Sequence, residues 1–152
     1  MTNTLLCPTR GGEASYPNQD QAIALAKERD AHLVFLYVSN VHFLDLTAAP
    51  KVFDIETELD EMGDFLLAMA QERADKAGLE ADTIVRRGEF RETLKDIIEE
   101  YQVTTVVLGA AGEETGVLTE AYLDTLSEEL CNETGTEFIV VHQGEIVKFC
   151  TP

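Results

Sequence analysis

Short apolar runs alternate with longer amphipathic segments along the whole chain. Five apolar runs have the length of buried strands: residues 4–7, 32–38, 81–88, 104–109 and 137–141. Four segments place apolar residues at steps of three and four, which predicts helices over residues 16–29, 55–77, 90–101 and 119–133. The uninterrupted run HLVFLYV (32–38) is typical of a strand that is covered on both faces.

Apolar strands separated by crossover helices indicate a parallel sheet with helices on both faces. We therefore expect an α/β fold with one open five-stranded parallel sheet, in a single domain over residues 1–152. Gly78 is well placed to end the second helix in a left-handed turn. Residues 39–54 form a long connection, and the tail 144–150 predicts an extra edge strand or a dimer contact.

The net charge of -18 is the extreme feature of the composition, with 29 acids against 11 Lys and Arg. No base lies between Lys95 and Lys148, where twelve acids do. Binding to nucleic acids and anionic membranes depends on Lys and Arg, so neither is an expected partner. The charge is best explained by solubility.

The opening residues MTNTLLCPTRGG lack the basic and apolar regions of an export signal, and no apolar run is long enough to span a bilayer. We therefore expect a cytoplasmic protein. Three cysteines without C-x-x-C spacing predict free thiols in a reducing compartment: Cys7, Cys131 and Cys150. The histidines are scattered without ligand spacing, so no metal site is predicted at His32, His42 or His142.

The glycines gather where the predicted strands end. In open parallel sheets, ligands bind beyond the carboxyl ends of the strands, where the strand order reverses. Those ends are residues 8–12, 38–40, 88 and 109–116. The sequence therefore predicts a binding crevice at this edge of the sheet.

Five motifs in order give the chain a family resemblance: LLCPTRGGEAS, LYV ending at Val38, VRRGEFRETL, VTTVVLGAAG and EFIVV. Together they resemble the universal stress protein family. The resemblance implies a flavodoxin-like, adenine-nucleotide alpha-hydrolase-like sheet of order 3-2-1-4-5. It also implies a homodimer joined through the last strands. Members divide into those that bind ATP and those that do not.

The nucleotide motif of the binding members is only half present. It reads G-x-x-G, nine further residues, then G-S or G-T, and Gly109 with Gly112 matches its first half. The pair at 122–123 stands nine residues on and is Tyr-Leu, whereas counting back from FIVV aligns Asp124 and Thr125 instead. Thr125 would offer a hydroxyl there. Asp124, as an N-cap, would occupy the amides that a phosphate needs.

Carboxylates crowd the glycine turn: Glu113 and Glu114 lie in it, and Glu120 follows. A like charge at about 4–6 Å and an effective dielectric near 20 costs about 3–4 kcal/mol. No P-loop lysine offsets this cost. The same acids lack EF-hand spacing, so they do not predict a cation site.

Arg10 occupies the position where the resemblance implies an Asp that contacts adenosine. It has three interpretations: it pairs with Glu113 or Glu114, it binds an acidic small molecule or a nucleotide with fewer phosphates, or it has no role. Phe90, where the family often has Pro, indicates a remodelled rim. Three further bases fall near the pocket edge: Arg86, Arg87 and Arg91.

No Ser-His-acid or Cys-His set is visible, and Cys7 lies inside a strand, where a buried inert thiol is expected. The sequence thus favours a noncatalytic stress-response protein that acts through dimerisation and partner contacts without ATP. The alternatives are a regulatory module that binds ATP or AMP, and a small-molecule sensor with residues 39–54 as a lid. The candidate crevice residues are Thr9, Arg10, Val38, Gly109, Gly112 and Thr125.

Overall fold

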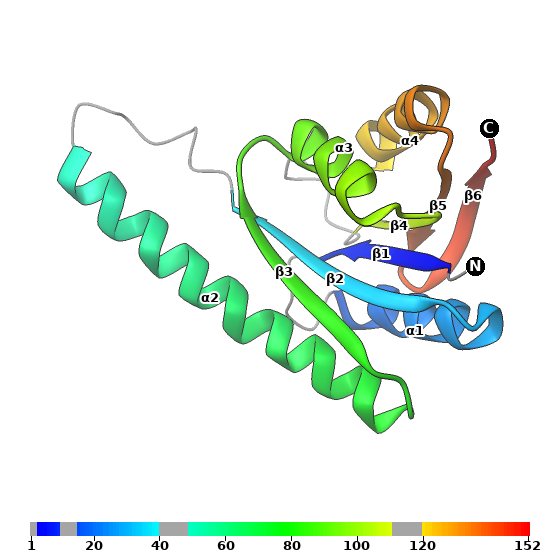
Figure 1. The fold of residues 1–152 in the computed structure, drawn as a ribbon, viewed down its shortest axis with the longest axis horizontal. Coiled ribbons are helices and arrows are strands. Elements are labelled where there is room, and N and C mark those ends of the chain that lie inside the picture. The colour runs from blue at the N-terminus through cyan, green and yellow to red at the C-terminus, as the bar shows by residue number, and fades with distance from the viewer. Residues whose placement is uncertain (1–2, 10–14, 40–48, 111–119) are drawn as a thin grey trace.

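Helices and strands alternate as the apolar pattern predicts (Figure 1). The computed structural model describes residues 3–9, 15–39, 49–110 and 120–152, with their side chains except in residues 49–60, 110 and 120. The elements in order are β1 (Thr4–Pro8), α1 (Tyr16–Arg29), β2 (His32–Ser39), α2 (Ala49–Lys76), β3 (Ala81–Arg87), α3 (Phe90–Tyr101), β4 (Thr105–Ala110), α4 (Glu120–Thr134), β5 (Glu137–His142) and β6 (Glu145–Cys150).

The strands form one sheet of order β3-β2-β1-β4-β5-β6. β1 to β5 are parallel, which confirms the predicted fold class and the order 3-2-1-4-5. β6 runs antiparallel to β5 and extends the sheet by one strand. Gln143 and Gly144, with φ of 50° and 86°, form the tight hairpin turn between them. The tail is therefore the edge strand that the sequence allowed.

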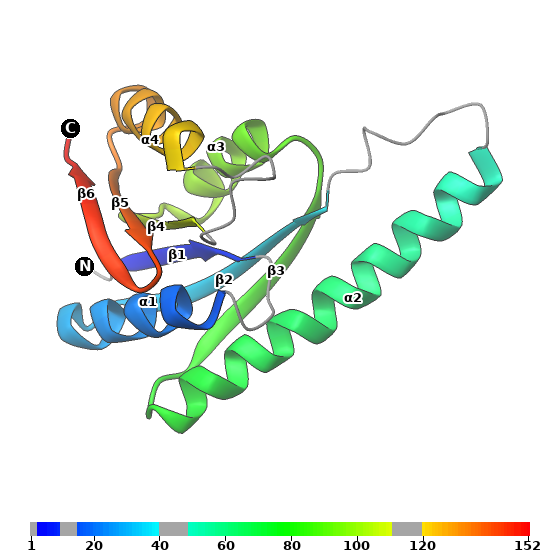
Figure 2. The same cartoon turned by 180° about the vertical axis from the view of Figure 1, so that it is seen from behind.

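Two helices cover each face of the sheet (Figures 1 and 2). Alternate strand residues point to opposite faces, so the core divides into two apolar layers. On the α1/α2 face, Leu5, Phe35 and Ile139 pack against the helices. On the α3/α4 face, Leu6, Leu36 and Phe138 do so. The strands are thus apolar on both sides, as their continuous apolar runs predict.

The second helix begins earlier than its periodicity predicts. The expected start was residue 55, whereas α2 begins at Ala49. Pro50 at its second position is compatible with a helix, because the first turn needs no donor there. Residues 49–54 are therefore helix and not part of a loop lid, and residues 40–48 lie outside the described residues. Gly78 ends the helix at φ 85°, as predicted.

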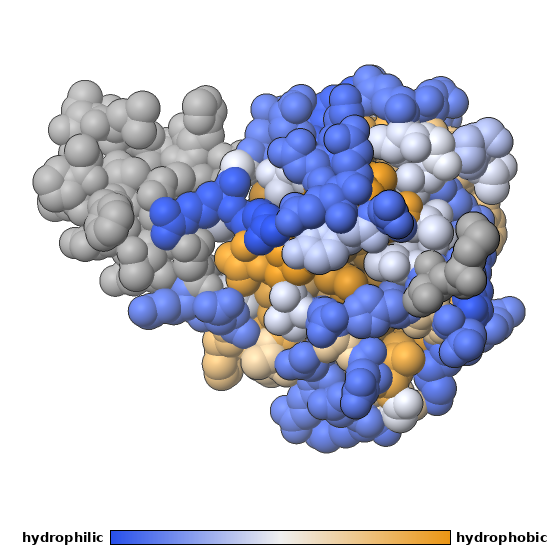
Figure 3. Space-filling view, in the orientation of Figure 1, coloured by the Kyte–Doolittle hydropathy of each residue, from blue (hydrophilic) through white to orange (hydrophobic). Residues whose placement is uncertain are grey.

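The surface in Figure 3 is mostly hydrophilic, with apolar patches between the charged side chains. Five large apolar side chains are exposed among the described residues: Met62, Phe65, Tyr101, Val147 and Phe149. None of the described helices has the length and hydropathy that a membrane span requires.

Candidate functional site

Three candidate residues lie at the carboxyl edge of the sheet. Thr9 follows β1 directly, and its N–H donates to the carbonyl oxygen of Leu36 at 2.8 Å. Its Oγ1 accepts a hydrogen bond from Gln19 Nε2 at 3.0 Å. Gly109 lies near the end of β4, the strand next to β1 in the sheet. Val38 lies near the end of the neighbouring β2 and packs against the α3/α4 face.

Gly109 is a glycine because the protein itself fills the space beside it. A Cβ on Gly109 would lie 2.6 Å from Asn18 Nδ2 and 2.9 Å from Asn18 Cβ, closer than real contacts. Asn18 is 6% exposed, and its Oδ1 accepts a hydrogen bond from the Gly144 N–H at 2.9 Å. One amide thus joins α1 to the end of β4 and to the β5–β6 turn. The glycine at 109 serves internal packing, a reason that does not involve a phosphate.

Two buried polar atoms near this edge lack hydrogen bonds. Gln19 Oε1 and Ser39 Oγ have no partner among the described residues, although these two residues are only 1% and 4% exposed. A buried polar atom without a partner costs about 1–3 kcal/mol, so such atoms commonly mark a place for water or a ligand. Sequence reasoning missed Gln19. The available signal was a polar residue three positions before Ala22, where the apolar stripe of α1 begins.

Thr125 and Asp124 do not lie where the sequence aligned them. The helix predicted over 119–133 is α4, which begins at Glu120, so both residues lie inside it. The expected N-cap role of Asp124 is therefore wrong. Thr125 is exposed, and its Oγ1 donates to the carbonyl oxygen of Ala121 at 3.2 Å. The alignment failed because it counted back from β5 without using the start of the helical periodicity.

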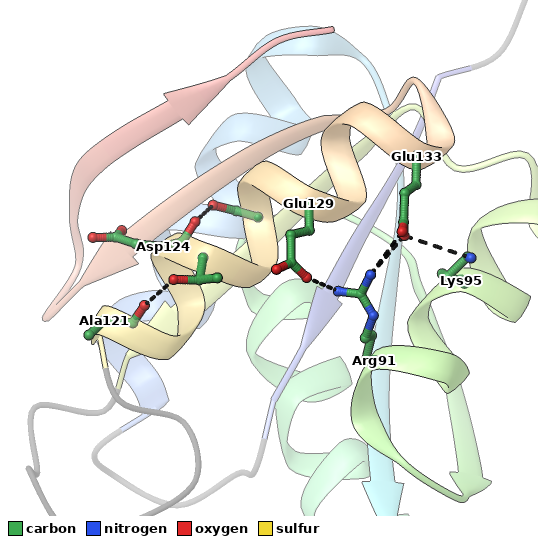
Figure 4. Close-up of polar contacts among 8 residues, drawn as sticks. Arg91, Lys95, Ala121, Asp124, Glu129 and Glu133 are labelled. Atoms are coloured by element: carbon green, nitrogen blue, oxygen red, sulfur yellow. Dashed lines mark hydrogen bonds and ion pairs between the residues drawn. The ribbon is translucent and has the colours of Figure 1, made fainter.

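Two acids of α4, Glu129 and Glu133, are paired with bases on α3 (Figure 4). Arg91 on α3 donates to Glu129 and, at 2.9 Å, to both carboxylate oxygens of Glu133. Lys95 Nζ lies 3.7 Å from the same Glu133 carboxylate. Arg91, a base expected at the pocket edge, is thus engaged by α4. These pairs hold α3 against α4 and partly neutralise the acidic helix.

Arg86 and Lys148 also pair with acids of neighbouring helices. Arg86 lies 3.5 Å from Glu100 on α3. Lys148 on β6 donates to Glu128 at 2.7 Å and to the carbonyl oxygen of Asp124 at 3.2 Å. The hydrogen bond to Glu128 raises the pKa of Lys148, against a smaller lowering by burial. The bases on this side therefore serve the protein's own carboxylates.

A hollow of about 410 Å³ lies at the other end of the sheet from these candidate residues. Thr4, His32 and Asp82 line it at the amino ends of the strands, with Gln71 and Tyr101 from the carboxyl ends of α2 and α3. His32 Nε2 and Asp82 Oδ2 are 2.7 Å apart. Helix carboxyl ends carry partial negative charge, so this end disfavours anions.

Cys7 has the environment of an inert thiol. It is 2% exposed on the α1/α2 face, and burial raises its pKa from 9.0 to about 12. The described residues contain no group of His, Cys, Asp and Glu that would hold a metal ion. Arg10, Gly112, Glu113 and Glu114 lie outside the described residues.

The sequence and the fold define the family. The sequence model of the universal stress protein family matches residues 1–142. Universal stress protein YxiE of Bacillus subtilis (strain 168) is 32% identical over 120 residues, which are 74% of this chain and 81% of YxiE. The chain belongs to the universal stress protein family. The family match ends with β5, so β6 lies beyond it.

Solved structures share the fold at low identity. The universal stress protein UspA from Lactobacillus plantarum has a TM-score of 0.74 at 16% identity, over 93% of this chain and 99% of that chain. The universal stress protein from Archaeoglobus fulgidus in complex with dAMP has a TM-score of 0.59 at 11% identity, over 91% and 96%. Membership of the family supports a role in the stress response.

Proposed function

We propose that this chain is a noncatalytic, cytoplasmic stress-response regulator that acts through self-association and partner contacts and does not bind ATP. The observation that carries the proposal is the contact between Gly109 and Asn18. The first glycine of the inherited turn is committed to Asn18, which in turn holds the Gly144 N–H. The backbone at this point therefore supports the protein's own packing.

The charge distribution supports the same conclusion. Two of the bases expected at the pocket edge are already paired: Arg91 with Glu129 and Glu133, and Arg86 with Glu100. A phosphate chain would have to compete with carboxylates that are part of the fold. It would also approach a protein with a net charge of -18.

Calorimetric titration tests the absence of ATP binding. We expect no heat of binding for ATP with magnesium up to millimolar concentration. A dissociation constant in the micromolar range would contradict the proposal. Heat-denaturing the purified protein and measuring adenine absorbance in the supernatant provides an independent check for nucleotide that co-purified.

Self-association is proposed to occur through β6. This strand is the edge of the sheet, and its backbone offers unpaired hydrogen-bonding groups. Val147 and Phe149 on it are 48% and 56% exposed. Pairing with β6 of a second copy would cover both side chains and both strand edges.

A point variant tests this contact more sharply than deletion of the tail, which would also remove the Gly144 partner of Asn18. Phe149→Ser should convert dimers to monomers in sedimentation velocity. Phe65→Ser is the matched control, because Phe65 is 65% exposed on α2. This helix packs on β2 and β3, whereas β6 is at the other end of the sheet. Equal sedimentation of the wild type and Phe149→Ser would contradict the role of β6.

A second function is favoured by the unpaired atoms of Gln19 and Ser39. A small ligand at the carboxyl edge, such as a nucleoside monophosphate, would supply the missing hydrogen bonds. The dAMP complex of the Archaeoglobus fulgidus protein makes AMP and dAMP the first probes. If this function holds, either nucleotide should raise the melting temperature, and Gln19→Leu should abolish that shift. Unchanged melting at millimolar nucleotide would reject it.

A further inference from the structure

Two of the three cysteines meet on the α3/α4 face although they are far apart in the sequence. Cys131 lies in the last turn of α4 and is 0% exposed. Cys150 ends β6 and pairs across the sheet with Phe138 of β5. Cys131 belongs to the apolar cluster on this face, and Cys150 packs against the same cluster. On the same strand as Cys150, Lys148 donates to Glu128 of α4 at 2.7 Å, so β6 lies beside the helix that carries Cys131.

We propose that Cys150 is an oxidation site for hydroperoxides and that Cys131 is its resolving thiol. The product is an intramolecular disulfide that fixes β6 to α4. Nothing in the family match extends to this strand, because the match ends at residue 142.

The chemistry has two steps that balance. The Cys150 thiolate attacks one peroxide oxygen, an S–O bond forms, the O–O bond breaks, and water or an alcohol leaves after protonation. The sulfur is oxidised by two electrons to a sulfenic acid, and the peroxide is reduced. The Cys131 sulfur then attacks the Cys150 sulfur, an S–S bond forms, the S–O bond breaks, and hydroxide leaves with the Cys131 proton as water.

The order of the two thiols follows from their surroundings. Cys150 is partly exposed, whereas Cys131 is fully buried and out of reach of the oxidant. Burial is the largest of the causes that raise the pKa of Cys131 from 9.0 to about 11, and the neighbouring Cys150 and Glu137 contribute to the same rise. Cys131 thus keeps its proton while Cys150 reacts. Its attack should be accelerated as the pH rises toward that pKa.

The disulfide would hold β6 more firmly to α4. Polar contacts of Lys148 with α4 hold the middle of the strand, and the thiol pair lies at its end. A covalent bond between Cys131 and Cys150 closes a loop that contains all of β5. It therefore restrains the one antiparallel strand of the sheet from leaving its place.

The experiment uses the full-length wild-type protein with hydrogen peroxide as the probe. After oxidation, free thiols are alkylated in denaturant and the disulfide is located by peptide mapping. We expect loss of two thiols per chain, a Cys131–Cys150 peptide, migration as one chain without reductant, and reversal by dithiothreitol. Cys7 serves as the internal control and should remain alkylatable. A wild type in which Cys150 stays a sulfenic or sulfinic acid, or pairs between chains, would overturn the proposal.

Two variants separate the roles. Cys131→Ala should accumulate a Cys150 sulfenic acid that dimedone traps, and Cys150→Ala should lose thiols at least tenfold more slowly than the wild type. Equal rates of thiol loss in the wild type and Cys150→Ala would refute the assignment.

Hydrogen exchange measures how firmly β6 is held in the sheet. The amides of β6 should exchange at least tenfold more slowly in the oxidised protein than in the reduced one. Identical exchange in both forms would remove the proposed effect on β6.

Discussion

The two faces of the sheet are held by different kinds of contact. On the α1/α2 face, Gly109 and Asn18 fit so closely that a single added carbon would collide. On the α3/α4 face, Arg91 joins α3 to two carboxylates of α4 across the surface. Each face also buries a thiol, Cys7 alone on the first and Cys131 beside Cys150 on the second.

This difference predicts which change, in side-chain volume or in salt concentration, will alter the stability of each face. A close-packed contact responds to volume and is indifferent to salt. A carboxylate–guanidinium network is partly exposed, so salt screens it and its loss costs little. The acidic side of the protein is thus the adjustable one, and the glycine contact is the rigid one.

Alkaline pH should lower the free energy of unfolding more than any of the substitutions below, because two thiols are buried. The pKa of Cys7 is raised from 9.0 to about 12 and that of Cys131 from 9.0 to about 11. Both remain protonated in the folded chain while the unfolded chain ionises. Stability is therefore unaffected by them below pH 9 and falls as the pH rises above it, by about 1.4 kcal/mol per pH unit for each thiol.

Urea unfolding at pH 8, 9 and 10 checks this expectation, with Cys7→Ala as the comparison. Above pH 9, the free energy of unfolding of Cys7→Ala should fall less steeply than that of the wild type, by the contribution of one thiol. Below pH 9, the pH dependence of the two proteins should be the same. The same decline in both proteins would show that Cys7 does not carry the effect.

Gly109→Ala should lower the free energy of unfolding by about 1–3 kcal/mol, because its Cβ would overpack against Asn18. Asn18→Gly relieves the contact, whereas Asn18→Ala does not, since Asn18 Cβ alone is 2.9 Å from the added carbon. In a double-mutant cycle, Gly109→Ala should cost much less when residue 18 is glycine. Full additivity would mean that Gly109 is not constrained by Asn18.

Arg91→Gln should cost less than about 1 kcal/mol at low salt, because it removes a partly exposed network with Glu129 and Glu133. The cost should shrink in 0.5 M sodium chloride, while that of Gly109→Ala should not. Thermal unfolding of both variants at two salt concentrations makes the measurement. Equal salt dependence of the costs of Arg91→Gln and Gly109→Ala would contradict the distinction between the two faces.

The smallest effect is expected at Thr125. Its hydroxyl bonds only to the backbone of its own helix in the contacts of the described residues, and its side chain is exposed. Thr125→Ala should change stability by less than about 0.5 kcal/mol, because alanine favours helix. If nucleotide binding were present and depended on Thr125, the same variant would weaken it in calorimetry.

Much of the fold could be predicted because its signals are local. The apolar runs located five strands, and Gly78 ended a helix where its left-handed turn was expected. The start of α2 was missed because the apolar spacing that predicted the helix begins at Ile55, six residues after Ala49. The place of Asp124 was missed because an alignment of motif letters overrode the helical period.

The position of the candidate site was predicted from the ends of parallel strands, whereas the contacts of the residues there were not. Thr9, Val38 and Gly109 fall at the carboxyl edge as the strand order requires. Asn18 comes from α1, and no spacing in the sequence relates it to Gly109 or Gly144. Gln19 comes from the same helix and binds Thr9. Their involvement depends on how closely the helix approaches the sheet.

The sequence by itself determined the alternation of strands and helices, the family and the acidic charge, because each depends on residue type and local period. Only the tertiary structure decided that Gly109 is reserved for Asn18, that Arg91 is paired with α4 and that Cys131 meets Cys150. These contacts join distant segments. Their existence depends on side-chain volume and distance, which the order of residues along the chain does not specify.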